Sequence, residues 1–222
     1  MKIKPLIVCS IAAISKICCN YEEAFTKAYE DPAIWQKEYV GTSGSGSTPK
    51  NARPYQELLQ RFLATHDIHS VIDLGCGDWQ FSRLINWTGI EYLGLDIVPK
   101  VIKANQEKYR AANIHFFTAN FIDIDLPKSD LLVCKDVLQH LPVQDIKRFL
   151  KKTGKYKYCL ITNDVDPLTL TSDNCDIPAG HYRPIDLTEA PFCLKARKIL
   201  TYRSGDEIKQ VLLIDNSGKL NE

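Results

Sequence analysis

The sequence predicts an α/β protein, a doubly wound three-layer sandwich with a mostly parallel sheet and a C-terminal antiparallel hairpin. From about residue 53 onward, short apolar runs alternate with amphipathic segments, which is typical of parallel strands joined by crossover helices. The last two apolar runs, at 196–203 and 207–215, flank the sequence Ser-Gly-Asp. Gly and Asp between apolar runs are typical of a tight turn, so these two runs predict the closing hairpin.

The expected elements follow one another in a regular order. After Pro54, apolar residues recur at steps of three and four, which predicts an amphipathic helix with Pro54 in its first turn. Further apolar runs predict strands at residues 69–74, 91–97, 114–119, 130–135 and 156–162. Intervening segments predict helices at residues 78–87, where Asp78 is placed to cap the first turn, at 98–110 and at 142–152.

The residues before this pattern divide into two parts. Residues 1–20 have a charged start, a short apolar run and small residues at suitable cleavage positions, so they are either a signal peptide or an apolar N-terminal extension. Their apolar run is too short for a transmembrane span, which takes about 20 residues. Residues 21–52 are expected to form a cap that includes the Gly/Ser segment GTSGSGSTP, and residues 53–222 to form one α/β domain.

Composition disfavours several classes of function. With 28 Lys and Arg against 27 Asp and Glu, the chain has a formal charge of +1, so it lacks the basic excess typical of nucleic-acid-binding proteins. The basic run at 147–157 is expected to be the solvated face of a helix. The eight Cys include no C-x-x-C pair, so neither a metal site nor a disulfide scaffold is expected. The oligomeric state is left open.

The most informative stretch is Val-Ile-Asp-Leu-Gly-Cys-Gly-Asp-Trp at 71–79, an expected strand that runs into a glycine turn. In open α/β sheets, ligands bind at the carboxyl ends of the strands, where glycine lets the backbone approach the ligand closely. Asp96 ends the next expected strand, near the offset of about 20 residues at which an acid binds ribose hydroxyls. This spacing predicts a nucleoside-binding site.

Two features of the loop disfavour a dinucleotide. Gln80 occupies the third glycine position of the G-x-G-x-x-G fingerprint, and Asp73 and Asp78 flank the turn. A pyrophosphate bound at a helix N-terminus would be repelled by such carboxylates. S-adenosylmethionine fits better because it combines a ribose with an amino group and a sulfonium and carries no phosphate. The two acids also have simpler interpretations, Asp73 as an acid that holds loop amides and Asp78 as a helix cap.

Three segments, VIDLGCGDWQ, YLGLDIVP and SDLLVCKDVLQHLP, resemble the class I S-adenosylmethionine-dependent methyltransferases in sequence and in order. A Gly-Ser-Gly-Ser segment before them and HYRPIDLTEAPF after them are similar to a small bacterial-type branch of that family. The resemblance covers roughly residues 31–194 and implies a Rossmann-like fold, S-adenosyl-L-methionine as the cofactor and methylation of an acceptor. A small molecule, a glycan and a protein side chain all stay open as the acceptor.

The resemblance also implies which residues contact the cofactor. The glycine turn would line the methionine portion, Asp96 would bind the ribose hydroxyls and Ile97 would pack on the adenine. Asn120 stands where such enzymes often carry an acid for the adenine amine, and the segment 43–47 would close over the cofactor. The expected cofactor-binding residues are Asp73, Gly75, Gly77, Asp78, Asp96, Ile97, Asn120 and Phe121.

Candidate catalytic and substrate residues follow the fourth and fifth expected strands. Asp136 ends the fourth strand, and His140 follows it four residues later. On a helix, the carboxylate would orient the imidazole as a base, whereas His140 would otherwise hold loop backbone. Candidate substrate contacts are Asn163 after the fifth strand, and Tyr182 and Arg183 in the irregular segment 173–187, because a long irregular segment is usually functional. The alternatives are that Arg183 pairs with a local Asp and that Tyr182 packs beneath the loop.

These observations predict a methyltransferase, a transferase that uses S-adenosylmethionine. Two other functions stay open, a methyltransferase-like binding module without turnover and a nicotinamide-dependent oxidoreductase. The missing third glycine and the two loop acids disfavour the oxidoreductase. Cofactor supply favours the cytoplasm, whereas a cleaved leader at residues 1–20 would place the protein in the periplasm or outside the cell.

Overall fold

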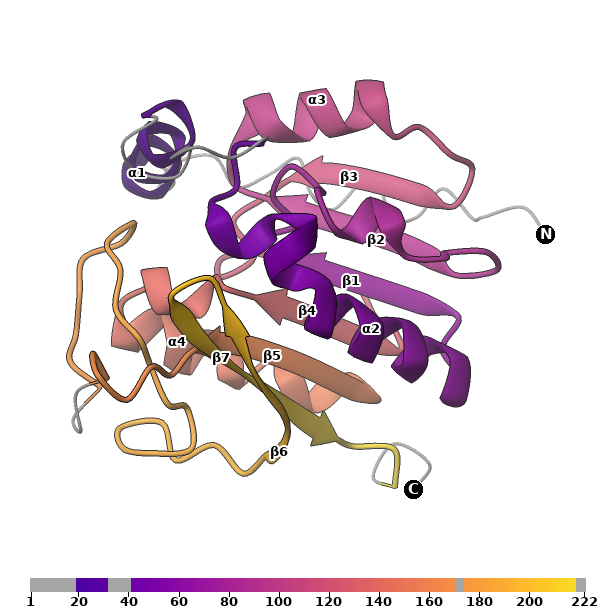
Figure 1. The fold of residues 1–222 in the computed structure, drawn as a ribbon. Coiled ribbons are helices and arrows are strands. Elements are labelled where there is room, and N and C mark those ends of the chain that lie inside the picture. Colours follow the sequence, from indigo (N-terminus) through magenta and orange to yellow (C-terminus); the bar gives the residue numbers. More distant parts are fainter. Residues whose placement is uncertain (1–18, 32–40, 171–173, 219–222) are drawn as a thin grey trace.

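A computed structural model describes residues 19–31, 41–170 and 174–218, so nearly all of the expected leader lies outside the described residues. The strands are β1 (Ser70–Leu74), β2 (Glu91–Asp96), β3 (Ile114–Thr118), β4 (Leu131–Lys135), β5 (Tyr158–Asp164), β6 (Arg197–Ser204) and β7 (Glu207–Asp215). They form one seven-stranded sheet in the order β3-β2-β1-β4-β5-β7-β6 (Figure 1). Strands β1 to β5 are parallel, and β7 is antiparallel to both β5 and β6. The predicted mostly parallel sheet with a closing hairpin is confirmed.

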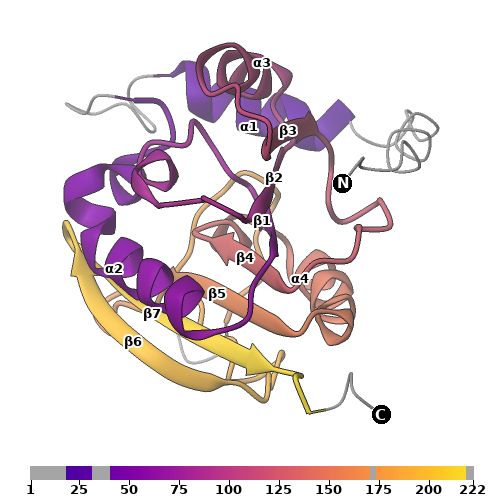
Figure 2. The ribbon, with the colours of Figure 1, turned by 90° about the vertical axis from the view of Figure 1, so that its right-hand side faces the viewer.

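Helices cover both faces of this sheet. The α-helices are α1 (Cys19–Glu30), α2 (Pro49–Thr65), α3 (Pro99–Lys108) and α4 (Val143–Leu150), and the short 3-10 helices are η2 (Ser45–Ser47), η3 (Ser82–Leu84), η4 (Leu138–His140) and η5 (Thr153–Lys155). Figure 2 shows α2 and α4 on opposite faces of the sheet. No helix among the described residues has the length and apolar character that crossing a membrane requires.

Each face of the sheet carries its own apolar core. On β1, Val71 packs in the core that includes Leu59 of α2, whereas the next residue, Ile72, packs in the core that includes Ile146 of α4. Side chains alternate between the faces of a strand, so a strand covered on both sides is apolar at consecutive positions. This is why the central strands appear in the sequence as unbroken apolar runs.

Helix α2 begins earlier than predicted. Thr48 is its N-cap and accepts a hydrogen bond from the backbone N–H of Asn51 (3.4 Å), so Pro49, the last residue of the Gly/Ser segment, is the first helical residue. Pro54 lies inside the helix, beyond its first turn. The predicted boundary at residue 53 therefore falls within α2, and the division of the chain into a cap and a domain stays a prediction.

The predicted helix at residues 78–87 is wrong, because only turns and η3 occur there. Trp79 has a φ of 59°, which lies in the left-handed region and is incompatible with a right-handed helix. Instead of capping a helix, the Asp78 carboxylate accepts a hydrogen bond from the backbone N–H of Thr42 (2.7 Å). The bounds of the other expected strands and helices agree with the structure within two residues at each end.

Candidate functional site

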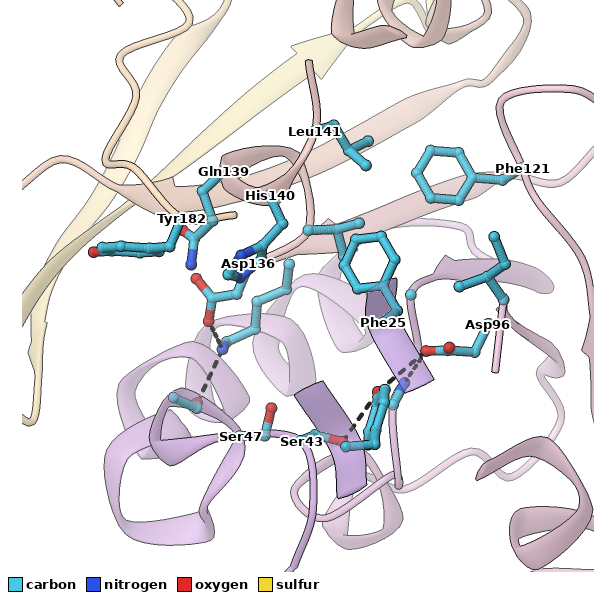
Figure 3. Close-up of a pocket in the computed structure, with 18 of the residues that line it drawn as sticks. Phe25, Ser43, Ser47, Asp96, Phe121, Asp136, Gln139, His140, Leu141 and Tyr182 are labelled. Carbon is cyan, nitrogen blue, oxygen red and sulfur yellow. Dashed lines mark hydrogen bonds and ion pairs between the residues drawn. The ribbon is translucent and has the colours of Figure 1, made fainter. Parts of the chain in front are cut away.

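A cavity of about 380 Å³ lies at the carboxyl ends of the parallel strands, and its volume is within the range of about 300–1,000 Å³ typical of small-molecule sites. Its wall comes from α1, the segment 43–47, the loops that follow β1 to β4, and the start of β7. Figure 3 shows Asp96 and Phe121 at one end and Asp136, His140 and Tyr182 at the other. One cavity therefore brings together residues that are far apart in the sequence.

The glycine turn forms part of this wall at Gly75 and Gly77. Their φ angles are 70° and 57°, in the left-handed region that glycine adopts without steric cost. A Cβ atom at Gly75 would lie 2.4 Å from the Val137 side chain, and one at Gly77 would lie 2.4 Å from Ser43 Oγ. The turn thus requires glycine at both positions, and the backbone approaches the cavity with no side chain between them.

Asp96, at the end of β2, is a buried carboxylate that lines the cavity. Its Oδ2 accepts hydrogen bonds from the backbone N–H of Gly77 (3.1 Å) and the Tyr29 hydroxyl (3.4 Å), and its Oδ1 accepts one from the Val98 N–H (3.0 Å). Burial raises the pKa of Asp96 above its ordinary value, and these hydrogen bonds oppose that rise. The carboxylate is therefore held in one orientation beside the glycine turn.

Helix α1 supplies a wall that sequence reasoning missed. Tyr21, Phe25 and Tyr29 recur at steps of four and all line the cavity, because residues four apart share one face of a helix. The Tyr21 hydroxyl donates to Asp145 of α4, and the Phe25 ring packs edge-on against His140. The aromatic stripe in YEEAFTKAYE was the signal that could have revealed this wall.

The residues after β2 and β3 form the neighbouring wall, where Ile97, Asn120 and Phe121 line the cavity as expected. The side chain of Asn120 is engaged within its own turn. Its Oδ1 accepts from the backbone N–H of Ile122 (3.1 Å), and its Nδ2 donates to Asp123 Oδ2 (2.7 Å). The segment 43–47 lies across this space and contributes a further wall, although contact between it and a cofactor stays a prediction.

Asp73 and Asp78 do not line the cavity, although both were expected to contact the cofactor. Asp73 is buried and accepts a hydrogen bond from the Tyr92 hydroxyl (2.6 Å), and burial raises its pKa to about 6. Asp78 binds Thr42, and its backbone N–H donates to Ser43 Oγ (2.7 Å). Asp78 thus holds the glycine turn to the segment 41–43. Asp73 binds the Tyr92 side chain of β2 and not the loop amides that its simpler interpretation required.

The opposite end of the cavity carries a network of four charged side chains, Lys135, Asp136, Lys209 and Glu207, all of which line it. Lys209 Nζ lies 3.0 Å from Asp136 Oδ1 and 2.8 Å from Glu207 Oε2. Lys135 Nζ contacts the other Asp136 oxygen and donates to the Gly46 carbonyl (3.0 Å). Burial alone would raise the pKa of Asp136, but the two ammonium groups lower it well below its ordinary value. Sequence reasoning did not find Lys209 or Glu207, because they lie on a hairpin far along the chain.

The geometry of Asp136 and His140 differs from the predicted one. Asp136 has a φ of 59°, and His140 lies in the 3-10 helix η4, so the two residues do not share an α-helical face. His140 lines the cavity, but its Nδ1 lies 3.0 Å from the His181 carbonyl oxygen, as its loop-holding alternative requires. Burial lowers the pKa of His140 to about 4, so its imidazole is neutral at neutral pH.

Of the three candidate substrate residues, only Tyr182 lines the cavity. Its hydroxyl donates to Asp164 at the end of β5. Arg183 is buried, and its guanidinium donates to the backbone carbonyls of Gln139 (3.1 Å) and Leu141 (2.9 Å) rather than to an Asp. Asn163 is buried within β5, opposite Gln210 of β7. The hydrogen bonds of Arg183 therefore hold the segment that includes Tyr182 against η4, beside the cavity.

No group of three or more His, Cys, Asp or Glu side chains in the described ranges is arranged to hold a metal ion. The cysteines of those ranges that the structure places, from Cys76 onward, are free thiols. The polar groups that line the cavity include carboxylates, ammonium groups, an imidazole and phenols.

Comparisons with known proteins agree with this architecture. Residues 72–156 match the family model of a methyltransferase domain. A search of curated protein sequences found no significant match.

The fold is also similar to solved structures. The N-methyltransferase NodS from Bradyrhizobium japonicum WM9, in complex with S-adenosyl-L-homocysteine, has 14% identity and a TM-score of 0.61, over 87% of this chain and 97% of that one. The magnesium protoporphyrin IX methyltransferase ChlM from Synechocystis PCC 6803, with bound S-adenosylmethionine, has 14% identity and a TM-score of 0.60, over 90% and 97%. The family match and the shared fold confirm the predicted resemblance to class I methyltransferases.

Proposed function

We propose that this chain, which has the fold and the domain of a class I methyltransferase, binds S-adenosylmethionine in the cavity and transfers its methyl group to an acceptor. The observation that carries this proposal is that one cavity joins the glycine turn and Asp96 to the charged network around Asp136. A cofactor end and an acceptor end are thus continuous, as group transfer requires. Cofactor supply makes the cytoplasm the proposed compartment.

The cavity fits this cofactor in shape and in charge. The turn at Gly75 and Gly77 has no room for a Cβ, which leaves backbone free to approach the methionine portion. The Asp96 carboxylate, held by three donors, has an orientation suited to accept hydrogen bonds from ribose hydroxyls. Ile97, Phe121 and the aromatic face of α1 supply apolar surface for a nucleobase. Carboxylates rather than an excess of cations line the site, which suits a ligand without phosphate.

S-adenosylmethionine supplies a methyl carbon activated by a positively charged sulfur. The acceptor atom forms a bond to that carbon while the carbon–sulfur bond breaks, and the sulfur keeps the electron pair. The protein then contributes mainly proximity and orientation, which are worth up to about 7–11 kcal/mol in favourable cases. In this chain, the walls from α1 and the segment 43–47 border the cavity, and we propose that they hold the two reactants together.

Asp136 and His140 have limited capacity as general bases. Asp136 stays ionised because of Lys135 and Lys209, and a carboxylate with such a low pKa accepts a hydrogen bond but not a proton at neutral pH. The neutral imidazole of His140, with a pKa of about 4, is also a weak base. We therefore propose that Asp136 orients a polar acceptor group, such as the amine or hydroxyl of a small molecule, glycan or protein side chain, and that Tyr182 contacts the same acceptor.

Calorimetry tests the cofactor. The purified protein is expected to bind S-adenosylmethionine and S-adenosylhomocysteine, and Asp96→Ala to weaken both by about tenfold or more, because each hydrogen bond to a charged group is worth about 1.5–3 kcal/mol. The exposed carboxylate of Asp67, which lies outside the cavity, provides the control variant Asp67→Ala. Binding of NADH, with none of either adenosyl ligand, would instead support the nicotinamide-dependent oxidoreductase.

Turnover requires a separate assay. Incubation of the protein with methyl-labelled S-adenosylmethionine and fractionated cell extract should transfer label to a component of at least one fraction. Asp136→Asn, which leaves the Asp96 end of the cavity unchanged, should reduce this transfer more than it reduces cofactor binding. Cofactor binding without label transfer in any fraction would favour the binding module without turnover.

A further inference from the structure

Three basic residues at and beyond the C-terminal end of α4 reach one segment of the cavity wall. Arg148, Lys152 and Lys155 follow one another at steps of four and three, and all three bind groups in the segment 121–126. Lys152 makes the most concentrated contact. Its Nζ donates to the backbone carbonyls of Phe121 (2.8 Å), Ile122 (2.6 Å) and Ile124 (2.8 Å). An ammonium has three donors, so this side chain uses all of them on one turn of backbone.

The same turn is held from a second side by a chain of hydrogen bonds. Arg148 Nη2 donates to Asp123 Oδ1 (2.8 Å), and Asp123 Oδ2 accepts from Asn120 Nδ2 (2.7 Å). Asn120 Oδ1 in turn accepts from the backbone N–H of Ile122 (3.1 Å). The Oδ1 and Nδ2 atoms of Asn120 are both engaged within the turn, so this side chain stabilises the shape of the wall. We therefore expect the backbone of the turn and the Phe121 ring to contact a ligand bound at this wall.

The side chains of the basic run at 147–157 thus include one group exposed to solvent and another bound to the segment 121–126. Lys147 and Lys151 are exposed to solvent, as expected for the solvated face of the run. Lys155 pairs with Asp125 (2.7 Å) and donates to the Leu126 carbonyl (2.6 Å), so it extends the contact of Lys152 along the same segment. The inward residues of the run therefore hold an irregular segment that immediately follows β3 and lines the cavity at Asn120, Phe121 and Ile122.

We propose that Lys152 is a positioning residue for nucleobase recognition, because it gathers three carbonyls and so fixes the backbone turn 120–124 against which the adenine of the cofactor binds. This rests on the proposed function, since it requires an adenosyl ligand at that wall. Lys152 itself is not among the residues that line the cavity, so it acts through the turn and not by contact with the ligand. A backbone turn without its central cation samples other conformations, and a ligand that binds one of them loses affinity.

Calorimetry with S-adenosylhomocysteine tests this role, with Lys151→Met as the matched control. Lys151 is the exposed neighbour of Lys152, so the two variants lose the same charge and differ in whether the three carbonyls lose their donor. We expect Lys152→Met to raise the dissociation constant about tenfold, Lys151→Met to leave it unchanged, and Lys152→Arg to restore most of the affinity because guanidinium also offers several charged donors.

A second measurement separates positioning from general loss of stability. The wild-type protein should bind adenosine more tightly than inosine, which lacks the exocyclic amine, and this preference should shrink in Lys152→Met but not in Lys151→Met. Equal affinities and equal adenosine-to-inosine ratios in the two variants would overturn the proposal. If Lys152→Met does not fold, Lys152→Gln is compared in the same way, and unchanged values there also overturn it. Failure of the wild-type protein to bind S-adenosylhomocysteine would contradict the proposed function itself.

Discussion

Lys209 is the central cation of the charged network at the acceptor end of the cavity, and Lys209→Met removes that cation while keeping a side chain of similar length. The Lys209 side chain is 1% exposed and pairs with Asp136, which is 15% exposed, and with Glu207, which is 30% exposed. Loss of one partner from a buried ion pair leaves an uncompensated charge and costs about 3–5 kcal/mol. Because Asp136 keeps Lys135 and Glu207 is partly solvated, we expect a loss of about 3 kcal/mol, at the lower end of that range.

Urea denaturation of matched variants measures this cost. Lys198 is the control, because it also pairs with one carboxylate, Asp186 (3.1 Å), yet its side chain is 47% exposed. An exposed pair contributes about 0–1 kcal/mol, so Lys198→Met should lower the free energy of unfolding by no more than about 1 kcal/mol. The double variant Lys209→Met with Asp136→Asn should lose less than the sum of its two single variants, by about 1–3 kcal/mol, because the pair is coupled. A cost for Lys209→Met no larger than that for Lys198→Met would refute the reasoning.

The pH dependence of stability gives the same network a second test. The folded-state pKa of Asp136 lies well below its ordinary value, which is about 3.9 in an unfolded chain. A carboxyl whose pKa is lowered by folding contributes stability that is present above the unfolded pKa and is lost as the pH falls below it. Wild-type protein should therefore lose stability as the pH falls below about 4. Lys209→Met should lose less over the same interval, because one of the two cations that lower this pKa is gone.

Two further predictions concern the cofactor end. Gly77→Ala should abolish binding of S-adenosylhomocysteine in calorimetry and destabilise the protein by about 1 kcal/mol or more, because its Cβ would lie 2.4 Å from Ser43 Oγ. Gly89→Ala is the control, since Gly89 also has a positive φ (76°) but has no atom within 4 Å of its Cβ. Burial raises the pKa of Asp73 to about 6, so its contribution to stability is greatest below pH about 4 and falls as the pH rises through 6. Asp73→Asn should therefore gain relative to wild type by about 2–3 kcal/mol between pH 4 and 8 in denaturation experiments, and an equal difference at both pH values would contradict this assignment.

The sequence was sufficient to predict the order and type of most elements because each central strand is apolar at consecutive positions and each turn carries Gly, Pro or Asp. It failed at residues 78–87, where the composition allows a helix but Trp79 is buried in a left-handed conformation. The local signals there, an Asp cap and scattered apolar residues, are outweighed by tertiary packing. No property of the residues 78–87 alone specifies where the Trp79 ring must pack.

The candidate site was predictable where it depends on position along a strand. Gly75, Gly77, Asp96, Ile97 and the residues after β3 line the cavity because they follow the carboxyl ends of adjacent parallel strands, which meet at one edge of the sheet. The remaining walls depend on contacts between distant segments. Helix α1 and β7 reach the cavity from distant parts of the chain. The aromatic stripe of α1 indicates a face that packs against the rest of the protein, but it does not specify that this face meets β7 at the cavity.

The charged residues also show how far the sequence alone predicts the site. The balance of 28 basic and 27 acidic residues shows that the chain has no overall basic excess, but it does not distinguish solvated charges from buried ones. The structure shows which charges are engaged inside the protein. Lys152 donates to three backbone carbonyls, and the buried Lys135 and Lys209 form ion pairs with Asp136 at the cavity. Replacing a buried ion pair with apolar residues is often neutral or stabilising, so stability alone does not account for the network around Asp136. The proposed function does account for it, because the two ammonium groups would keep Asp136 ionised and fixed at the end of the cavity where we propose that the acceptor binds.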